Sequence, residues 1–570
     1  MIRPKAHSEG FWLHLITTAA FCAYLFFFGL GAVGLTGADE PRYAQIAREM
    51  LQRNDWVTPV LYGKPWLEKP VLYYWEAMVS YRLFGVSDWA ARVPSALSAS
   101  AMVFGIFFFA GFWARHRNGG HGFALDAALM TAAAAGCIGF AHGASTDMAL
   151  TAMFTLAMLC WLRAALPGGA LSRGWLLGFY FCLSLATLAK GPVAVLLAGG
   201  IIVISAALLR RWKLVQWSLW WPGVLLYLAT SAPWYIAVQR ANPQFAREFF
   251  LQHNLERFAT GVYRHHQPFW YYAPVLAAAL VPWTVGCAVA FARRAVHLKA
   301  ASTRREDATR QPSRPPARPG AAETTPGGDF LAIALMAWAI VPVVFFSFSQ
   351  SKLPGYILPA VPAWPMLLAL FISDSRNSKP SPLLLVPHAA IAGALVAAAV
   401  LLPAVVLKSA PGRLALATAI AAGAVLFTAM VVTLRSRGMG AVRFVTLVSV
   451  IIALAYIVRV DAPVLDARVS ARALARRIAQ TVPAGASIAA FHAKREVEYG
   501  LAFYLNRPIA NYDRQEIPGG DHLVVAPAGS APALQQAAGG RRVSWIGAYE
   551  AQRLELFWVS TVPAAASVKH

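Results

Sequence analysis

Charged residues gather in two short motifs near the N-terminus, Asp39-Glu40-Pro41-Arg42-Tyr43 and Glu68-Lys69. Both follow a long apolar run, so they lie at the depth where the headgroup of a membrane lipid would lie. Arginine and lysine bind phosphate oxygens, and a carboxylate beside them can orient an acceptor group or take its proton. These residue types suit chemistry on a lipid-borne phosphate, with Asp39 at its centre. The alternative is that Asp39 only caps a helix.

The remaining polar residues expected on the same side of the membrane are few. They are His142, Asp147, Lys190, the loop from His253 to His266, which includes Arg257 and Arg264, and the segment Ser351 to Tyr356 with Lys352. Charges this close to the ends of apolar runs are costly unless they face a cavity or a partner, and recurring cations suit a phosphorylated substrate. Lysine and arginine also reach from helix ends to lipid headgroups, and we favour that interpretation for Arg257 and Arg264 taken singly.

A divalent metal is a second chemistry to consider. His265 and His266, with Glu68 as a third ligand, could hold one. Adjacent histidines point to opposite sides of an extended chain, so we favour a polar turn at the membrane interface and expect no certain cofactor. The five cysteines all fall in apolar runs, and we expect neither disulfides nor a cysteine metal site.

Helical periodicity indicates which elements carry the two motifs. Tyr43, Ile46, Ala47, Met50 and Leu51 repeat at helical spacing after Asp39, which predicts an amphipathic helix lying on the membrane surface with Pro41 in its first turn. A second amphipathic helix is expected from Val71 to Phe84, after Lys69. The first charged motif is therefore expected to open a surface helix, and the second to precede one.

The rest of the chain has the composition of a multi-pass helical membrane protein. Of its 570 residues, 58% are hydrophobic and 13% are charged. Apolar runs predict an all-α bundle of about thirteen crossings. The expected spans are Phe11 to Leu35, Val93 to Trp113, Ala124 to Phe140, Met148 to Leu162, Trp175 to Ala189, Pro192 to Leu209, Leu219 to Val238, Trp270 to Phe291, Phe330 to Phe348, Tyr356 to Ile372, Leu383 to Leu407, Leu414 to Leu434 and Phe444 to Ile457.

The formal charge of +24 is dispersed over the loops, which argues against nucleic acid as a partner. Alternate loops are richer in lysine and arginine, as cytoplasmic loops are. With an odd number of spans, the N-terminus is expected in the cytoplasm, and Asp39 and the C-terminal tail on the opposite side. The Pro- and Arg-rich segment from Ala301 to Gly328 is expected to be a disordered cytoplasmic linker.

A change of composition near Asp461 predicts two domains. Residues 1–460 form the membrane domain, with residues 36–90 as its first extracytoplasmic loop, and residues 461–570 form a small soluble α/β domain. One helix is expected at Ala467 to Val482. Strands are expected at Ser487 to Phe491, His522 to Ala526, Val543 to Ile546 and Leu554 to Val559. This domain could govern substrate access or act as a stabilising appendage.

Three motifs in this order carry a resemblance to a known family: DEPRYA from Asp39, WLEKPVLYYW from Trp66 and SKLPGYILP from Ser351. They are similar to the GT-C polyprenyl-phosphate glycosyltransferases, and within these most to the 4-amino-4-deoxy-L-arabinose lipid A transferases. The resemblance implies an enzyme of the bacterial inner membrane that moves aminoarabinose from undecaprenyl phosphate to lipid A phosphate at the periplasmic face. That modification reduces polymyxin binding.

The resemblance also implies roles for individual residues. Asp39 matches the catalytic aspartate, and Lys69 would bind the carrier phosphate with help from Arg42, Tyr43 and Glu68. Lys352 and Tyr356 are further candidates for substrate binding.

Two alternatives remain open. Another transferase using a polyprenyl-phosphate sugar, such as a protein O-mannosyltransferase, would share these residues. A carrier of lipid-linked sugar would place charges along a midplane path and repeat one half of the chain in the other, and neither pattern is present.

Overall fold

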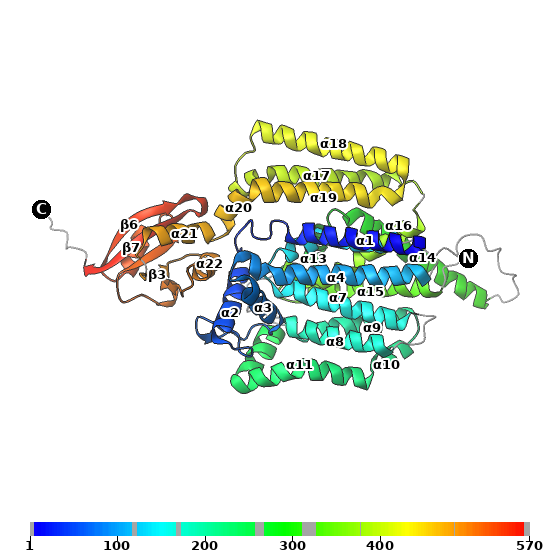
Figure 1. Cartoon of the computed structure of the whole chain (residues 1–570), viewed down its shortest axis with the longest axis horizontal. Coiled ribbons are helices and arrows are strands. Elements are labelled where there is room, and N and C mark those ends of the chain that lie inside the picture. Colours follow the sequence, from blue (N-terminus) through cyan, green and yellow to red (C-terminus); the bar gives the residue numbers. More distant parts are fainter. Residues whose placement is uncertain are drawn as a thin grey trace.

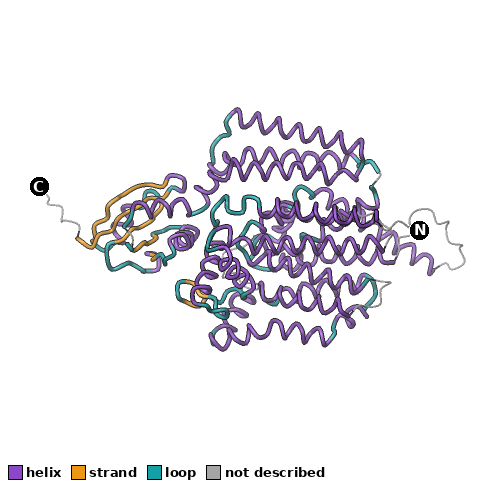
Figure 2. The backbone as a smooth tube through the Cα atoms, in the orientation of Figure 1, coloured by secondary structure: helices purple, strands orange, loops and turns teal. Residues whose placement is uncertain are grey.

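The computed structural model describes residues 5–116, 122–166, 173–256, 267–310, 326–376, 378–483 and 485–563. A bundle of long helices makes up most of the molecule, and a small sheet with its own helices lies at one end of that bundle (Figure 1). Figure 2 shows that almost all strands belong to this end. The expected combination of a helical bundle with a small C-terminal α/β unit is present.

Long apolar helices show that this is a multi-pass membrane protein. Among the described residues eight helices are long and apolar enough to cross a membrane, or up to ten if each of two bent pairs is one span. The bundle helices are α1 (Lys5–Cys22), α4 (Asp88–His116), α5 (Gly122–Ala132), α6 (Ala135–Ala141), α7 (Thr146–Ala165), α8 (Arg173–Lys190), α9 (Val193–Leu208), α10 (Lys213–Ser218), α11 (Trp221–Ala241), α13 (Tyr272–Ala279), α14 (Thr284–Arg310), α15 (Pro326–Ser347), α16 (Ala363–Asp374), α17 (Pro382–Leu407), α18 (Arg413–Arg437) and α19 (Val442–Tyr456).

The span count expected from the sequence is higher than this. Three of the thirteen expected spans, those of α8, α9 and α11, are not among the eight to ten. Two others are broken: α5 and α6 meet at 59°, and the pair of segments Phe269–Ala279 and Thr284–Ala300 is bent by 115°. The structure therefore supports the bundle, and the number thirteen stays a prediction.

Two boundaries differ from the sequence-based expectation. The first span was expected to run to Leu35, but its helical part ends at Phe27, and Gly29 has a φ of +76°, which helical residues do not adopt. The linker was expected to begin at Ala301, but α14 continues to Arg310. That stretch lacks proline and is rich in Ala and Arg, so extending an existing helix costs little. Residues 311–325 lie outside the described part.

The two amphipathic helices of the first loop are confirmed as helices. They are α2 (Asp39–Arg53) and α3 (Leu72–Phe84), with Pro41 in the first turn of α2. A short hairpin, β1 (Val60–Leu61) and β2 (Lys64–Pro65), lies between them in sequence. Both helices lie at the end of the bundle that faces the C-terminal sheet (Figure 1). The polar face of α2 is covered by a helix of the C-terminal region, a contact that the expected membrane-surface position did not include.

The C-terminal sheet has five strands in the order β4-β3-β5-β7-β6. Strands β3 (Ser487–Ala490), β4 (Ala510–Asn511) and β5 (His522–Pro527) are parallel, and β7 (Leu554–Pro563) joins β5 and β6 (Arg541–Tyr549) antiparallel. All four expected strands are present, and β4 was not expected. The helices of this region are α20 (Ala462–Val469), α21 (Arg472–Thr481), α22 (Arg495–Leu505) and α23 (Ala531–Ala537).

The single helix expected from Ala467 to Val482 is wrong. The chain breaks it into α20 and α21 at Ser470, which has an extended backbone (φ −117°, ψ 145°) and pairs with Thr36 in an isolated bridge. Its hydroxyl also accepts the amide of Arg472. A contact with the loop before Asp39 therefore overrides the helical periodicity of the sequence.

Candidate active site

Asp39 is the first residue of α2, and its side chain is 58% exposed. The residue before it, Ala38, occupies the cap position, and no side chain caps this helix end. Arg42 Nη2 donates to Asp39 Oδ1 at 2.6 Å, one helical turn further on. Asp39 therefore does not serve as the helix cap, and its carboxylate faces outward beside a cation at the positive end of a helix.

Arg42 is held in an aromatic cage. Its guanidinium carbon lies 5.2 Å from the ring centroid of Tyr43, 5.0 Å from that of Trp66 and 5.8 Å from that of Tyr499. Its Nη2 lies 3.6 Å from Glu68 Oε2, and only 9% of the side chain is exposed. Burial by itself lowers the pKa of Arg42, but Tyr43, Glu68 and Asp39 outweigh it and raise that pKa. The guanidinium therefore stays charged and fixed in direction.

Tyr43 lies at the base of this cage. It is buried, and its ring packs edge-on against Tyr74 and at a tilt against Tyr73. Burial, followed by the negative charges of Asp39 and Glu68, raises the pKa of Tyr43 well above its usual value. Its phenol is therefore neutral at any physiological pH and supports Arg42 as an aromatic surface.

The positive and negative side chains continue beyond Arg42 in a series that we call the charge row: Asp39, Arg42, Glu68, Lys69, Asp147 and Lys190. Lys69 Nζ lies 3.6 Å from Glu68 Oε1, and its charge also acts on the carboxylate of Asp147. Asp147 at the start of α7 forms an ion pair with Lys190 at the end of α8. The row joins the first loop to two helix ends of the bundle, so its charges face one region.

The SKLPGYILP segment borders the charge row. Lys190 Nζ lies 4.7 Å from the ring centroid of Tyr356, and a side chain at Gly355 would come within 2.8 Å of Asp147 Cγ. Gly355 therefore permits the backbone to approach that carboxylate. Lys352 is buried, and its ammonium donates to the carbonyls of Gln267 at 3.1 Å and Ser349 at 2.6 Å. These bonds fix the segment, and a role of Lys352 in substrate binding stays a prediction.

A buried ion pair holds the start of α2 against the bundle. Glu40 accepts from Arg92 Nη2 at 2.7 Å and Nε at 3.1 Å, and also from the amides of Thr36 and Ala144. Arg92 donates in turn to the carbonyls of residues 30, 33 and 34. Burial favours protonation of Glu40, but Arg92 and the amide donors reverse this and lower its pKa.

The C-terminal region fixes the other side of α2. Arg48 Nη1 donates to the Phe503 carbonyl at 2.8 Å and to Asn506 Oδ1 at 3.0 Å, and its guanidinium carbon lies 4.4 Å from the Phe503 ring centroid. Tyr504 Oη accepts the Leu35 amide at 2.7 Å and donates to Asp88. α22 therefore contacts both α2, the helix that begins at Asp39, and the loop that precedes α2.

Of the three metal ligands considered from the sequence, only Glu68 lies within the described residues. His265 and His266 lie outside the described residues, and Glu68 contacts Arg42 and Lys69. No group of three or more His, Cys, Asp or Glu side chains within the described ranges could hold a metal ion.

The structure brings together Asp39, Arg42, Tyr43, Glu68, Lys69 and Tyr356, six of the seven residues singled out as site candidates. Asp147 and Lys190, expected from the sequence on the same side of the membrane as Asp39, belong to the same row. Tyr499 was missed. It lies hundreds of residues from Arg42 in the chain, and nothing in its local pattern distinguishes it from a core tyrosine.

Comparison with known proteins gives three kinds of similarity. The family model for dolichyl-phosphate-mannose-protein mannosyltransferases matches residues 12–247. An undecaprenyl phosphate-alpha-4-amino-4-deoxy-L-arabinose arabinosyl transferase of Serratia proteamaculans is 30% identical over 379 residues, which are 64% of this chain and 60% of that protein. Its namesake from Aeromonas hydrophila is 31% identical over 359 residues, 61% of this chain and 58% of that protein. The matched part thus spans about three fifths of these relatives.

The crystal structure of ArnT from Cupriavidus metallidurans bound to undecaprenyl phosphate superimposes with a TM-score of 0.71, at 23% identity, over 95% of this chain and 97% of that one. The chain has the ArnT fold. The apo structure of the same ArnT gives a TM-score of 0.68. The resemblance to the aminoarabinose transferases is therefore confirmed in sequence over about three fifths of the chain, and the likeness to the ArnT fold covers 95% of it.

Proposed function

We propose that this ArnT-like chain transfers 4-amino-4-deoxy-L-arabinose from undecaprenyl phosphate to a phosphate group of lipid A at the periplasmic face of the inner membrane. The modified lipid A would carry less negative charge and bind polymyxin and other cationic peptides less well. The charge row carries this proposal, because it gathers cations and acids at one end of an apolar bundle. The names of the similar arabinosyl transferases supply the donor and the sugar.

The transfer reaction gives Lys69 and Arg42 a role at the leaving phosphate. An oxygen of the acceptor phosphate forms a bond to the anomeric carbon of the sugar, while the bond from that carbon to the carrier phosphate breaks. The carrier phosphate leaves as an anion, so it needs no acid, but it gains charge in the transition state. Lys69 and Arg42 stabilise that charge, and the cage keeps Arg42 from turning away.

Asp39 has a different task. A phosphate monoester has a second pKa of about 6, so the acceptor is already ionised near neutral pH and does not need a strong base. The exposed carboxylate of Asp39 orients the acceptor or the ammonium group of the sugar, or takes a remaining acceptor proton directly.

The proposal includes a topology and a division into domains. The N-terminus lies in the cytoplasm, residues 1–460 form the membrane domain, and residues 461–570 form a periplasmic domain. Thirteen crossings result if α8, α9 and α11 span the membrane beside the ten candidates. In support, α1 begins at the end of the bundle opposite the C-terminal sheet (Figure 1).

A second candidate function is transfer of another polyprenyl-phosphate sugar, for example mannose, to a different acceptor. The match of residues 12–247 to the mannosyltransferase model favours it. Lipid A mass spectra from cells with and without the gene separate the two. Our proposal predicts an aminoarabinose mass addition that disappears with the gene, and an unchanged addition rejects it. In detergent there is no membrane across which a lipid could be moved. Product formed by the purified chain under these conditions would therefore exclude a carrier that only transports lipid-linked sugar.

A further inference from the structure

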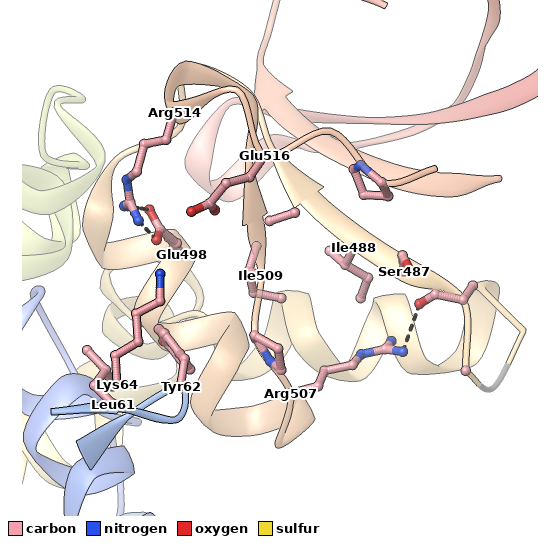
Figure 3. Close-up of a pocket in the computed structure, with 15 residues that line it drawn as sticks. Leu61, Tyr62, Lys64, Ser487, Ile488, Glu498, Arg507, Ile509, Arg514 and Glu516 are labelled. Atoms are coloured by element: carbon pink, nitrogen blue, oxygen red, sulfur yellow. Dashed lines mark hydrogen bonds and ion pairs between the residues drawn. The ribbon is translucent and has the colours of Figure 1, made fainter. Parts of the chain in front are cut away.

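The proposed function does not use a cavity that lies between the first loop and the C-terminal region. It has a volume of about 520 Å³ and lies between the β1–β2 hairpin of the first loop and the C-terminal sheet (Figure 3). Tyr62 and Lys64 line it from the hairpin, and Glu498, Arg507 and Arg514 line it from the C-terminal region. A cavity of this size holds one or two sugar rings.

The cavity and the cage of Arg42 are built from residues that are neighbours in sequence. Glu498 lines the cavity, and the next residue of α22, Tyr499, packs against Arg42. On the other wall, Lys64 lines the cavity, and Trp66, two residues on, also packs against Arg42. Neighbouring residues of α22 and of the first loop therefore line the cavity and surround Arg42.

The charges of the cavity favour an anionic occupant. The carboxylate of Glu498 is satisfied by Arg514 Nη2, at 2.7 and 2.9 Å to its two oxygens, and by Asn511 Nδ2 at 2.9 Å. Glu516 lines the same cavity and accepts the Asn511 amide at 3.2 Å. The positive charges of Lys64 and Arg507 therefore outnumber the one remaining negative charge, that of Glu516, and the lining has a net positive charge.

Two donors in the lining lack acceptors. The hydroxyl of Tyr62 and Nε of Arg507 are buried and have no hydrogen-bond partner within the described part of the chain. Leaving such groups unpaired is unfavourable, and a ligand that supplies oxygen acceptors pairs them when the two side chains turn toward the cavity. Sugar hydroxyls and phosphate oxygens are such acceptors, and the side chains of Ile488, Ile509 and Pro508 offer apolar surface for a sugar ring.

The hairpin is attached to the helix that carries Asp39. Glu49 of α2 accepts the Tyr62 amide at 3.0 Å and the Gly63 amide at 3.1 Å. An occupant of the cavity is thus held at a fixed position relative to α2. We infer that this cavity binds the phosphorylated saccharide headgroup of the acceptor lipid while one of its phosphates reacts at the charge row. This inference rests on the proposed function, because it takes the acceptor from it.

The binding test uses the purified full chain and a deacylated, bis-phosphorylated glucosamine disaccharide as probe, measured by calorimetry. Lys64→Ala is expected to weaken binding about tenfold, since it removes a charged hydrogen-bond donor from the lining. Lys494→Ala, at an exposed lysine of the same region outside the cavity, is the matched control. The unphosphorylated disaccharide is expected to bind at least tenfold more weakly than the probe. Equal affinity for both disaccharides, or no effect of Lys64→Ala, overturns the inference.

Tyr62→Phe separates binding from folding. It removes a buried hydroxyl without a partner, so the melting temperature is expected to stay the same or rise, while affinity for the probe falls. A purely structural role for Tyr62 would leave affinity unchanged, and that result contradicts the inference.

Transfer assays then distinguish failure of this inference from failure of the proposed function. Lys64→Ala is expected to raise the KM for the acceptor about tenfold and to leave the KM for the donor as it was. Transfer with an unaltered acceptor KM rejects the cavity as an acceptor site but keeps the proposed function. Absence of transfer by the unmodified chain rejects the proposed function, and the calorimetric result still decides whether the cavity binds the saccharide.

Discussion

Each charged side chain of the site has an opposite charge beside it, so the row is stable without substrate and still offers cations to a phosphate. Arg42 cannot turn, because three rings and two carboxylates surround it. Lys69 has a flexible stem and interacts with the acids on either side of it, Glu68 and Asp147. This difference assigns Arg42 a fixed contact and Lys69 a contact that adjusts to the leaving phosphate.

Lys69→Ala should therefore lower kcat/KM about 100-fold, the effect of removing one donor that stabilises a transition-state anion. Lys69→Arg should recover part of the loss, since it restores the charge. Steady-state assays with the purified chain measure both, with Lys213→Ala at an exposed position of α10 as the control. A Lys69→Ala enzyme with an unaltered kcat/KM would show that Lys69 does not contact the reacting phosphate.

The ionisation of Glu40 makes the stability of the folded protein depend on pH. Its pKa lies below the ordinary value of 4.5 in the folded protein. The unfolded chain therefore takes up a proton at a higher pH than the folded chain, so this stabilisation is complete above pH 4.5 and is lost as pH falls through the folded pKa.

Removing one partner of a buried pair costs about 3–5 kcal/mol. Glu40→Gln should lower the melting temperature at pH 7 and flatten its decline in acid, as scanning fluorimetry in detergent would show. Melting of Glu40→Gln at the same temperature as the unmodified chain would contradict this role.

Much of the site was predictable from local sequence because its charges are rare in an apolar chain. Asp39, Arg42, Glu68 and Lys69 stand out on that ground alone, and the structure joins them. The pairing of Asp147 with Lys190 depends on how α7 packs against α8, which no local pattern encodes. Tyr499 depends on a contact between distant parts of the chain, so its sequence neighbourhood carried no signal.

At the scale of elements, α2 is clamped between the bundle and α22. Glu40 fixes its start through Arg92, and Arg48 fixes its middle through the C-terminal end of α22. Apolar periodicity predicted α2 and α3 well, because their spacing is strongly helical. It could not predict that the polar face of α2 meets protein, since a polar face looks the same in sequence whether it contacts water or a hydrogen-bonding partner.

Arg48→Ala should lower both kcat and the melting temperature, because two hydrogen bonds and a ring contact to α22 disappear. Arg48→Lys should recover part of the stability. Arg53→Ala is the matched control, since Arg53 is an exposed arginine in the last turn of the same helix. If Arg48→Ala and Arg53→Ala behave alike, the C-terminal region does not position α2.

At the scale of the whole molecule, α2 and α3 of the first loop lie with the C-terminal sheet at one end of the bundle, and the link from α18 to α19 lies at the other (Figure 1). The span count could not be fixed from sequence or helix length, because α9 is a short apolar helix and two other spans are bent. Which end of the bundle faces the periplasm therefore needs a direct measurement.

Single cysteines introduced into a variant without the five native ones provide that measurement. Lys494→Cys should react with a membrane-impermeant maleimide in spheroplasts, whereas Arg437→Cys should react only after lysis. Both positions are exposed, so folding does not hide them. Labelling of Arg437→Cys in intact spheroplasts would reverse the proposed orientation.

The central claim is that Asp39, at the exposed end of the charge row, acts in the transfer of sugar from the polyprenyl phosphate. It is tested most directly by single-turnover transfer of aminoarabinose from undecaprenyl phosphate to lipid A by the purified Asp39→Asn variant, followed by mass spectrometry. Glu496→Gln, at an exposed acid of α22, serves as the control. We predict a rate at least 100-fold below that of the unmodified chain for Asp39→Asn and an unaltered rate for the control. A near-normal rate for Asp39→Asn would contradict the claim.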